Sequence, residues 1–442
     1  MNNKMGFRLI VMLVSLLLVL SGCGSSNGNA GQNPESAQPE ASGNNGGKEN
    51  VELTLVYPSD PGAEKKLNAL IDEYRKTNPH VTVKFVFIPF SGWPDYITKV
   101  KTMIAGGNSP DLLRLAVEGI EQLVNDDLAM PFDDFLAANP DFVQSVNIGD
   151  IHPNINAPFK INGKTYGLAW DWNNVVMHIN TELLREAGLE MPNGTWTKDE
   201  FLQYAQALTK EKNGQKQYGF MIPSDYFLTT GFLYNNNASI LNEDMTKSTL
   251  DDPKAIEVIQ FMHDLVYKYK VSPVPGPNVD ASRLFMTGQL AMYPAGRWPI
   301  LGYQDNQFTD FDVQYLPEFQ TQKVAFGTGA FPVLKTSKHT EEAMRLAAWL
   351  SGSEYSQKNF LATDSIPSRV SVMKELLPNE KPDNGVIFGD SADIAVPIQA
   401  PVQYTDVANA FTKYLSMVYS NQMTVEDAMK AAAKEIDGIV GK

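Results

Sequence analysis

The alternation of strand and helix patterns is the feature that most restricts the fold of this chain. Residues 51–57 form a β-rich apolar run, and apolar side chains then recur over residues 67–74 at the spacing of one helical face. A second strand pattern covers residues 80–88, a second helix pattern covers 96–104, and a third strand pattern covers 111–115. Strands joined through helices pair in parallel by right-handed crossovers, so the sequence predicts an α/β fold with a parallel sheet.

Polar residues at the starts of the helical patterns predict where the helices begin. Asp60 before Pro61 is typical of an N-cap followed by the first helical position. Thr197 with Glu200 three residues later forms a capping box. Three further residues are predicted N-caps: Asp252, Thr340 and Thr424.

The N-terminal segment predicts export and anchoring. Lys4 and Arg8 precede an apolar run over residues 9–20, which is shorter than the ~20 residues that span a bilayer. The tetrapeptide 20–23 (LSGC) resembles the bacterial lipobox, which implies removal of residues 1–22 and lipidation of Cys23 at the new N-terminus. The alternative is an ordinary secretory signal that contains a cysteine. Cys23 is the only cysteine, and without lipidation it would be a reactive thiol in an oxidising compartment.

Residues 24–50 are rich in Gly, Ser, Asn, Gln, Pro and Glu and contain no large apolar side chain, so they cannot bury enough surface to fold. Together with Cys23 they form a predicted tether, with a reach of roughly 30 Å. We therefore expect a protein that is held by lipid at the extracellular face of the cell membrane.

Charge and length restrict the rest of the chain. The formal net charge of −15 argues against nucleic acid, because binding to phosphates requires a basic surface. The remaining residues, about 390, exceed what one hydrophobic core usually serves, so two lobes are expected. We expect a monomer.

Three stretches resemble signature regions of the extracellular solute-binding proteins of ABC importers, the family that includes the maltose-binding and multiple-sugar-binding proteins. They occur in the family's order behind the lipobox and tether. The stretches are residues 162–197 (NGKTYGLA, followed by AGL and TWT), 285–298 (FMTGQLAM, followed by GRW) and 327–343 (GTGA, followed by SKHTEEA).

This resemblance implies a two-lobed type II periplasmic-binding-protein fold, with discontinuous lobes and hinge crossings. The expected boundaries are 51–168 plus about 318–368 for lobe 1 and 169–317 plus about 369–442 for lobe 2. The implied function is capture of a carbohydrate, expected to be an oligosaccharide, between the lobes and its delivery to an ABC permease by hinge closure.

A sugar site needs aromatic planes for C–H faces and planar polar groups for hydroxyls. The run Trp170-Asp171-Trp172-Asn173 offers both, and if it is extended its two tryptophans share a face. By resemblance the run lies where the chain crosses between lobes, and Trp298 stands where the family places a stacking aromatic. Arg297 could contact ligand or form a structural ion pair. Tyr226, in a predicted loop after a strand over 218–222, could stack on ligand or pack in the core.

Further candidates follow predicted strands or lie near the signature regions. Asp60 and Glu118 lie in strand-to-helix segments, which line the cleft in such sheets, although Asp60 could simply be a cap. The remaining candidates are Trp93, Phe331 and Arg369.

The sequence offers no sign of catalysis, metal binding or a cofactor. The five histidines are scattered without metal-ligand spacing, and no nucleophile elbow or phosphate-binding loop is present. We expect a binding protein that is not an enzyme and needs no cofactor. The alternatives are a receptor for another solute such as a polyamine, a ligand-sensing partner of a sensor kinase, and a secreted glycoside hydrolase with two carboxylates in the cleft.

Overall fold

The computed structural model describes residues 49–59, 62–212, 214–276, 279–360 and 365–441. Lys48–Lys442 form one compact unit. The predicted signal segment 1–22, the predicted lipidation residue Cys23 and most of the predicted tether lie outside the described residues.

The first sheet is parallel, which confirms the α/β prediction. It has the order β2-β1-β3, with β1 (Val51–Ser59) paired along its whole length with β2 (Val81–Pro89). The predicted third strand is broken in two, and only β3 (Leu112–Leu113) pairs with β1. The second piece, β4 (Leu115–Ala116), pairs antiparallel with a strand of another sheet. Arg114 lies at this break and connects the two sheets.

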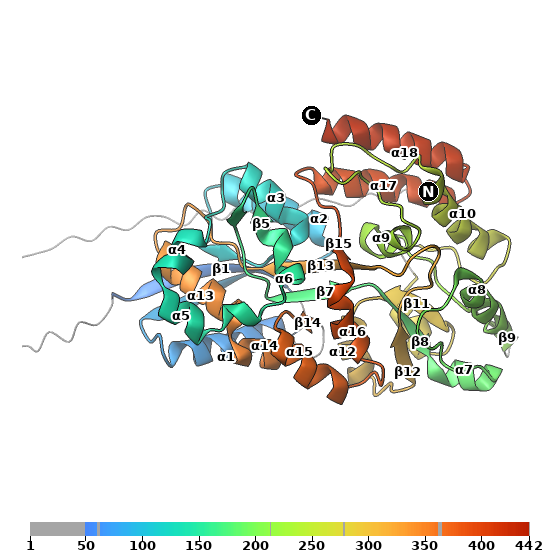
Figure 1. Cartoon of the computed structure of the whole chain (residues 1–442), viewed down its shortest axis with the longest axis horizontal. Helices are drawn as coiled ribbons and strands as arrows, with labels where there is room; N and C mark the ends of the chain where they lie inside the picture. Colours follow the sequence, from blue (N-terminus) through green and yellow to red (C-terminus); the bar gives the residue numbers. More distant parts are fainter. Residues whose placement is uncertain (1–48, 60–61, 213, 277–278, 361–364, 442) are drawn as a thin grey trace, which may run out of the picture. The chain divides into compact units, whose positions relative to one another are not determined.

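The second sheet joins segments that are far apart in the sequence (Figure 1). Its order is β14-β7-β13-β15, with β4 also paired to β13. The strands are β7 (Asp171–Asn174), β13 (Val324–Ala330), β14 (Ile366–Pro367) and β15 (Ala395–Pro397). Because β7 and β13 pair antiparallel at its centre, the chain passes through this sheet in both directions.

The third sheet is antiparallel and has the order β11-β8-β12. Its strands are β8 (Val176–Asn180), β11 (Met292–Ala295) and β12 (Phe311–Gln314). His178 in the central strand is fully buried, and its Nε2 lies 2.8 Å from the Gly296 carbonyl oxygen. Burial lowers the pKa of His178 to about 4, so its ring is neutral at pH 7.

Two short hairpins complete the strands of the described residues. They are β5 (Lys160–Ile161) with β6 (Lys164–Thr165), and β9 (Lys210–Lys212) with β10 (Gln215–Gln217). The predicted strand over 218–222 is wrong, because Tyr218 forms only an isolated bridge to Leu290.

Helices cover the sheets. In the first half they are α1 (Ala63–Arg75), α2 (Trp93–Ala105), α3 (Val117–Asn125), α4 (Asp133–Ala138), α5 (Pro140–Ser145), α6 (Pro153–Asn156), α7 (Thr181–Ala187) and α8 (Lys198–Ala207). In the second half they are α9 (Tyr226–Asn235), α10 (Pro253–Tyr267), α11 (Ala281–Met286), α12 (Pro299–Asp305), α13 (Thr340–Gly352), α14 (Glu354–Phe360), α15 (Val370–Leu376), α16 (Val386–Asp390), α17 (Tyr404–Tyr419) and α18 (Val425–Val440). The short 3-10 helices of the described residues are η1 (Ile148–Asp150), η2 (Ala157–Phe159), η3 (Leu377–Asn379) and η4 (Ser391–Asp393).

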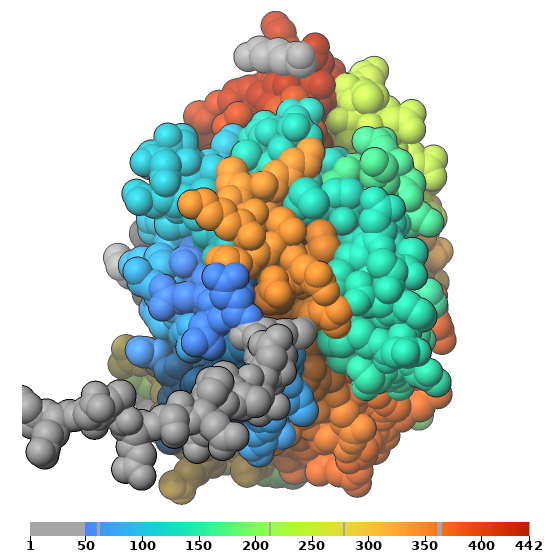
Figure 2. Space-filling view, turned by 90° about the vertical axis from the view of Figure 1, so that its left-hand side faces the viewer, coloured from blue at the N-terminus to red at the C-terminus, as the bar shows by residue number. Residues whose placement is uncertain are grey.

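Two hydrophobic cores hold these elements. The first surrounds β1 and the second sheet and continues to one face of the third sheet, where Phe285 and Tyr303 lie. The second lies between the other face of the third sheet and α8, α9, α10, α17 and α18. In the space-filling view of Figure 2, the orange segment that contains α13 lies between blue N-terminal residues and the teal residues around α5. The first core is thus built from segments that are distant in sequence.

The helix starts agree with the sequence at some predicted caps and differ at others. The capping box of Thr197 and Glu200 is present, and Asp252 and Thr424 accept hydrogen bonds from the first turns of α10 and α18. The cap predicted at Thr340 is wrong, because His339 occupies the N-cap and Thr340 is the first helical residue. The first helix begins at Ala63 instead of Pro61. Gly62, its N-cap, has a φ of 90°, a left-handed conformation that lies outside the helix and that glycine adopts readily.

Substitution of Thr197 by alanine should destabilise the protein by about 0.5–2 kcal/mol, because the N–H of Glu200 loses its acceptor. Thr340→Ala is the matched control and should have a smaller effect, because this threonine lies inside the first turn of α13 and is not the cap. Urea denaturation of both variants measures the difference. Equal losses would show that the cap at Thr197 contributes nothing specific.

Candidate functional site

A cavity of about 500 Å³ opens where elements of the two hydrophobic cores face each other. This volume lies within the range of small-molecule sites, which is about 300–1,000 Å³. Its walls come from the loop between β2 and α2, the β3-to-α3 segment, strands β7 and β13, and the starts of α9, α12 and α17. The lining residues are Phe90, Ser91, Gly92, Trp93, Pro94, Arg114, Ala116, Glu118, Asp171, Trp172, Asn173, Asp225, Tyr226, Phe227, Trp298, Gly327, Thr328, Tyr404, Ala408, Asn409 and Thr412.

A buried ion pair forms one wall of this cavity. Arg114 Nη2 donates to Asp171 Oδ1 at 2.6 Å, and Arg114 Nη1 donates to the Leu115 carbonyl oxygen at 2.9 Å. The guanidinium carbon lies 5.5 Å from the ring centroids of both Trp93 and Trp170, which places the cation between two aromatic rings. This arrangement fixes Asp171 at the cavity wall with one carboxylate oxygen committed to arginine.

Gly329 allows the arginine to lie against β13. A Cβ at this position would stand 1.8 Å from Arg114 Nη1, so any other residue would displace the guanidinium. The glycine of the third signature stretch therefore provides space for the ion pair beside it.

Glu118 is a buried acid at the same wall. Its side chain lies in the first turn of α3, and Oε2 is buried without a hydrogen-bond partner in the structure. Burial raises the pKa of the Glu118 carboxyl to about 7, Arg114 lowers it in part, and Asp171 raises it further. An unpaired buried acceptor at a cavity wall is well suited to a ligand that donates a hydrogen bond.

Two aromatic side chains that line the cavity are exposed. Phe90, from the loop before α2, is 44% exposed, and Trp298, just before α12, is 42% exposed. Large apolar side chains are usually buried, so two exposed ones at one cavity make it a candidate binding surface. The ring of Phe90 lies 5.2 Å from that of Trp93, and the ring of Trp298 lies 6.1 Å from that of Phe227.

Gly296 determines how the indole of Trp298 lies. A Cβ at residue 296 would stand 2.2 Å from the indole and 2.8 Å from Asn173 Oδ1. The same Asn173 oxygen accepts a hydrogen bond from the Arg297 backbone N–H at 2.8 Å. The Gly-Arg-Trp sequence thus connects the exposed indole to strand β7.

Tyr226 lines the cavity, but the prediction that it lies in a loop is wrong. It is the first residue of α9, is 3% exposed, and donates from its hydroxyl to the Gln399 carbonyl oxygen at 2.8 Å. Its ring lies 5.2 Å from that of Tyr404 of α17. Both tyrosines therefore support the wall from inside the second core.

The structure brings seven of the sequence-predicted residues to one cavity. They are Trp93, Glu118, Asp171, Trp172, Asn173, Tyr226 and Trp298. Their role toward a ligand stays a prediction. Asp60 lies outside the described residues.

Trp170 and Phe331 lie in the first core and do not line the cavity. Trp170 is fully buried, its Nε1 donates to Ser356 Oγ at 3.0 Å, and its ring lies 4.8 Å from that of Phe331. In the extended run the two tryptophans share a face, as predicted, but that face is turned into the core. Trp172 reaches the cavity with only 1% of its surface exposed.

Arg297 does not line the cavity and forms the structural ion pair that the sequence left open. Its side chain is 1% exposed, pairs with Glu380, and donates from Nη1 to the Ser365 carbonyl oxygen at 2.8 Å. The arginine thus connects the segment before α12 to the segments on both sides of α15.

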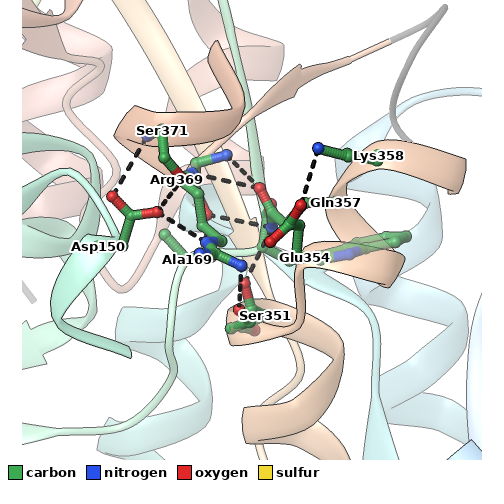
Figure 3. A network of polar contacts seen from close by, with 11 residues as sticks. Asp150, Ala169, Ser351, Glu354, Gln357, Lys358, Arg369 and Ser371 are labelled. Atoms are coloured by element: carbon green, nitrogen blue, oxygen red, sulfur yellow. Dashed lines mark hydrogen bonds and ion pairs between the residues drawn. The ribbon is translucent and has the colours of Figure 1, made fainter. Parts of the chain in front are cut away.

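Arg369 also lies away from the cavity, in the polar network of Figure 3. Its Nε donates to Asp150 Oδ2 at 2.8 Å, and its Nη1 donates to the Gly352 carbonyl oxygen at 3.1 Å. Gln357 Oε1 accepts from the backbone N–H groups of Ser368 and Arg369. This network fixes the chain between β14 and α15 against α13 and α14, which is a structural role.

The family model for bacterial extracellular solute-binding proteins matches residues 58–357, more than half of the sequence. The chain belongs to this family. Its fold is the two-lobed type II periplasmic-binding-protein fold, which solved structures of similar proteins share.

Individual relatives cover most of the chain. An ABC substrate-binding protein from Listeria monocytogenes, solved in complex with cycloalternan, is 27% identical with a TM-score of 0.81, over 89% of this chain and 100% of that one. Maltose-bound MalE3 of T. maritima is 20% identical with a TM-score of 0.75, over 87% and 98%. The arabinooligosaccharide-binding protein of Bacillus subtilis is 23% identical over 98% of this chain and 99% of its own length.

Two further observations concern all of the described residues. Every helix among them is too short or too polar to cross a bilayer. Within the same residues, no three His, Cys, Asp or Glu side chains gather where they could hold a metal ion.

Sequence reasoning missed several residues of the cavity, namely Phe90, Arg114, Asp225, Phe227, Tyr404, Asn409 and Thr412. Phe90 lies three residues before Trp93 in the same strand-to-helix segment, so extending that candidate backward would have found it. Tyr404 and Asn409 lie on an amphipathic helix near the C-terminus, and no local signal relates this helix to the cavity.

We expect Glu118→Gln to stabilise the protein at alkaline pH. The pKa of Glu118 is raised from the ordinary 4.5 to about 7 in the folded chain, so the unfolded chain loses the proton first as the pH rises. The contribution of protonated Glu118 to the free energy of unfolding is complete below pH 4.5, and it is lost as the pH rises through 7. Glutamine removes this loss, so the variant should gain about 1–3 kcal/mol at pH 8.5 and little at pH 5.

Melting curves of wild type and variant from pH 5 to 8.5 measure this difference. Glu52→Gln is the matched control, because Glu52 is exposed to solvent on β1. A difference between Glu118→Gln and wild type that stays constant over this range would contradict the predicted ionisation of a buried carboxyl.

Proposed function

We propose that this protein is a lipid-anchored receptor that captures an oligosaccharide in the cavity between its lobes and delivers it to an ABC permease. The observation that carries the proposal is the pairing of exposed aromatic planes with buried polar groups in one cavity. Phe90 and Trp298 offer surfaces for the C–H faces of a sugar, and Glu118 offers an unpaired acceptor for a hydroxyl.

The ligands of the relatives support a carbohydrate. The Listeria protein was solved with cycloalternan, the T. maritima protein with maltose, and the B. subtilis relative is named for arabinooligosaccharides. These ligands share hydroxyl-rich edges and apolar faces, which suit the cavity described above. They differ in sugar and linkage, so the proposal names the class and not the compound.

The mechanism is hinge closure. Phe90 and Glu118 lie in segments that follow the strands of the first sheet, whereas Trp298 follows β11 of the third sheet and Tyr226 packs in the second core. A ligand that contacts both sides favours the closed state through its differential affinity. The permease then recognises that state. We propose the lobe boundaries 51–168 plus about 318–368 and 169–317 plus about 369–442.

We propose binding without catalysis. A glycoside hydrolase needs two carboxyl groups that flank the scissile bond. Among the described acids of the cavity, Asp171 is engaged by Arg114, and Asp225 Oδ1 caps α9 by accepting from the Leu228 N–H at 2.8 Å. Of the three acids that line the cavity, only Glu118 keeps a buried oxygen without a partner, and this supports a receptor over a hydrolase that needs two carboxyl groups. We also propose that the receptor acts as a monomer.

A thermal-shift screen tests the function. The probes are maltose to maltohexaose, mannobiose to mannohexaose and arabinobiose to arabinohexaose, with spermidine as a non-sugar. A ligand that binds the native state raises the melting temperature by mass action. We expect at least one sugar series to stabilise the protein. Trp298→Ala and Phe90→Ala should each weaken binding of that sugar by about 5- to 150-fold in calorimetry, equivalent to about 1–3 kcal/mol.

The matched control is Tyr355→Ala, which removes an exposed aromatic side chain outside the cavity and should leave affinity unchanged. Stabilisation by spermidine alone would replace the carbohydrate by a cationic solute. Wild-type affinity in both cavity variants would rule out the aromatic surfaces as the binding site, and products released from the bound sugar would indicate an enzyme.

Lipid anchoring is tested separately at Cys23. The Cys23→Ser protein cannot be acylated at this position, so it should leave the membrane fraction and lose its detergent partitioning while its melting temperature stays that of the wild type. Two or more acyl chains are needed for stable anchoring, so this loss should be nearly complete. Unchanged membrane association of the variant would disprove the lipoprotein proposal.

A further inference from the structure

Several hydrogen-bond donors in the wall of the cavity are used within the protein. Four lining residues each donate their one side-chain hydrogen to a main-chain carbonyl oxygen, at distances from 2.8 to 3.1 Å: Trp172, Tyr226, Thr328 and Thr412. A hydroxyl or an indole has a single hydrogen to donate, so these side chains have none left for a ligand. A ligand that depends on accepting hydrogen bonds therefore gains nothing from these four donors.

The carboxyl groups of the same wall are in the opposite situation. Glu118 is 6% exposed, and its Oε2 is buried without a hydrogen-bond partner. Asp225, the N-cap of α9, also lines the cavity. Among the described residues of the lining, Arg114 is the only cation, and it is paired with Asp171. The lining therefore holds two carboxyl groups, Glu118 and Asp225, without a cation to balance them.

Both of these carboxyl groups act on one tyrosine, and aromatic rings stand beside them. Burial raises the pKa of the Tyr404 hydroxyl well above its ordinary value, and the charges of Glu118 and Asp225 raise it further. The rings of Phe227 and Trp298, 6.1 Å apart, line the same cavity. Carboxylates attract a cation, and the faces of aromatic rings add to that attraction.

We propose that the cavity selects an amino sugar, an oligosaccharide that carries a primary ammonium group, and that the Glu118 carboxylate receives this ammonium. The inference rests on the proposed function, because it names the chemical class of the same ligand. An ammonium has three hydrogens to donate and accepts none, so it matches a wall whose donors are used and whose carboxyl groups are free. A hydrogen bond between an ammonium and a carboxylate is also stronger than one between neutral groups. A neutral sugar can donate a hydroxyl to Glu118, but it leaves the negative charge of the wall unbalanced.

The test compares three trisaccharides that differ only at carbon 2 of each residue, namely chitotriose with free amines, its N-acetylated form, and cellotriose. Calorimetry at pH 7 should show chitotriose binding at least about 10-fold more tightly than either neutral sugar, which corresponds to about 1.4 kcal/mol. Glu118→Gln keeps the shape of the side chain and removes its charge, so this ratio should fall to within about twofold of one. Asp225→Asn keeps an oxygen that can cap α9 and should lower the ratio by at least about threefold. Melting curves verify that both variants are folded.

The matched control is Glu121→Gln, which removes a charge from the same helix α3 outside the cavity and should keep the wild-type ratio. An equal fall of the ratio in this control would show an effect of overall charge and overturn the role of Glu118, as would an unchanged ratio in both cavity variants. If a neutral sugar of the screen above binds and chitotriose binds no more tightly than its N-acetylated form, the amino-sugar class is wrong and the proposed function stands. If no sugar binds, with or without amines, the proposed function itself fails.

Discussion

The ion pair between Arg114 and Asp171 is the interaction on which the rest of the site depends. It joins the break between β3 and β4 to strand β7, and Trp93 and Trp170 enclose the guanidinium. A charge taken out of water is costly unless its partner is in place, and loss of one partner of a buried pair is strongly destabilising. The carboxylate that faces the cavity is therefore held by the same contact that joins two sheets. A substitution of Arg114 or Asp171 would therefore disturb the fold and the cavity wall together.

Two glycines show how closely the chain is packed around the site. Gly329 leaves space for the guanidinium of Arg114, and Gly296 leaves space for the indole of Trp298. Neither glycine has a backbone conformation that requires it, since both lack the positive φ of the turn glycines. Their value lies in the missing side chain, which lets a large cation and a large aromatic ring lie directly on the backbone. The exposed indole of Trp298 thus lies in close contact with the backbone underneath it, and the structure keeps an apolar plane at the cavity.

Sequence reasoning located residues that lie beside local motifs, and it misplaced residues whose surroundings come from distant parts of the chain. Trp298 and Glu118 lie beside local signals, namely a Gly-Arg-Trp motif and the end of a predicted strand. Trp170 and Trp172 alternate as predicted, yet their shared face turns into the first core, because Ser356 and the Pro367 carbonyl oxygen accept from their indole N–H groups there. Period-two alternation defines a face but not what covers it. Arg369 likewise depends on Asp150, which is far away in the sequence.

The sequence by itself determined the α/β class, the parallel first sheet, three of the five predicted helix caps and the family, because each depends on periodicity, capping or motifs that are local in the chain. Only the tertiary structure decided which of the candidate side chains share a cavity. Phe90, Trp298 and Tyr404 come from three distant segments, and their meeting depends on how two hydrophobic cores pack on the crossing strands β7 and β13. The hydrogen bonds of the cavity wall are of the same kind. Tyr226 and Thr328 donate to carbonyl oxygens of segments that are distant in the sequence, and no local pattern encodes that choice of partner.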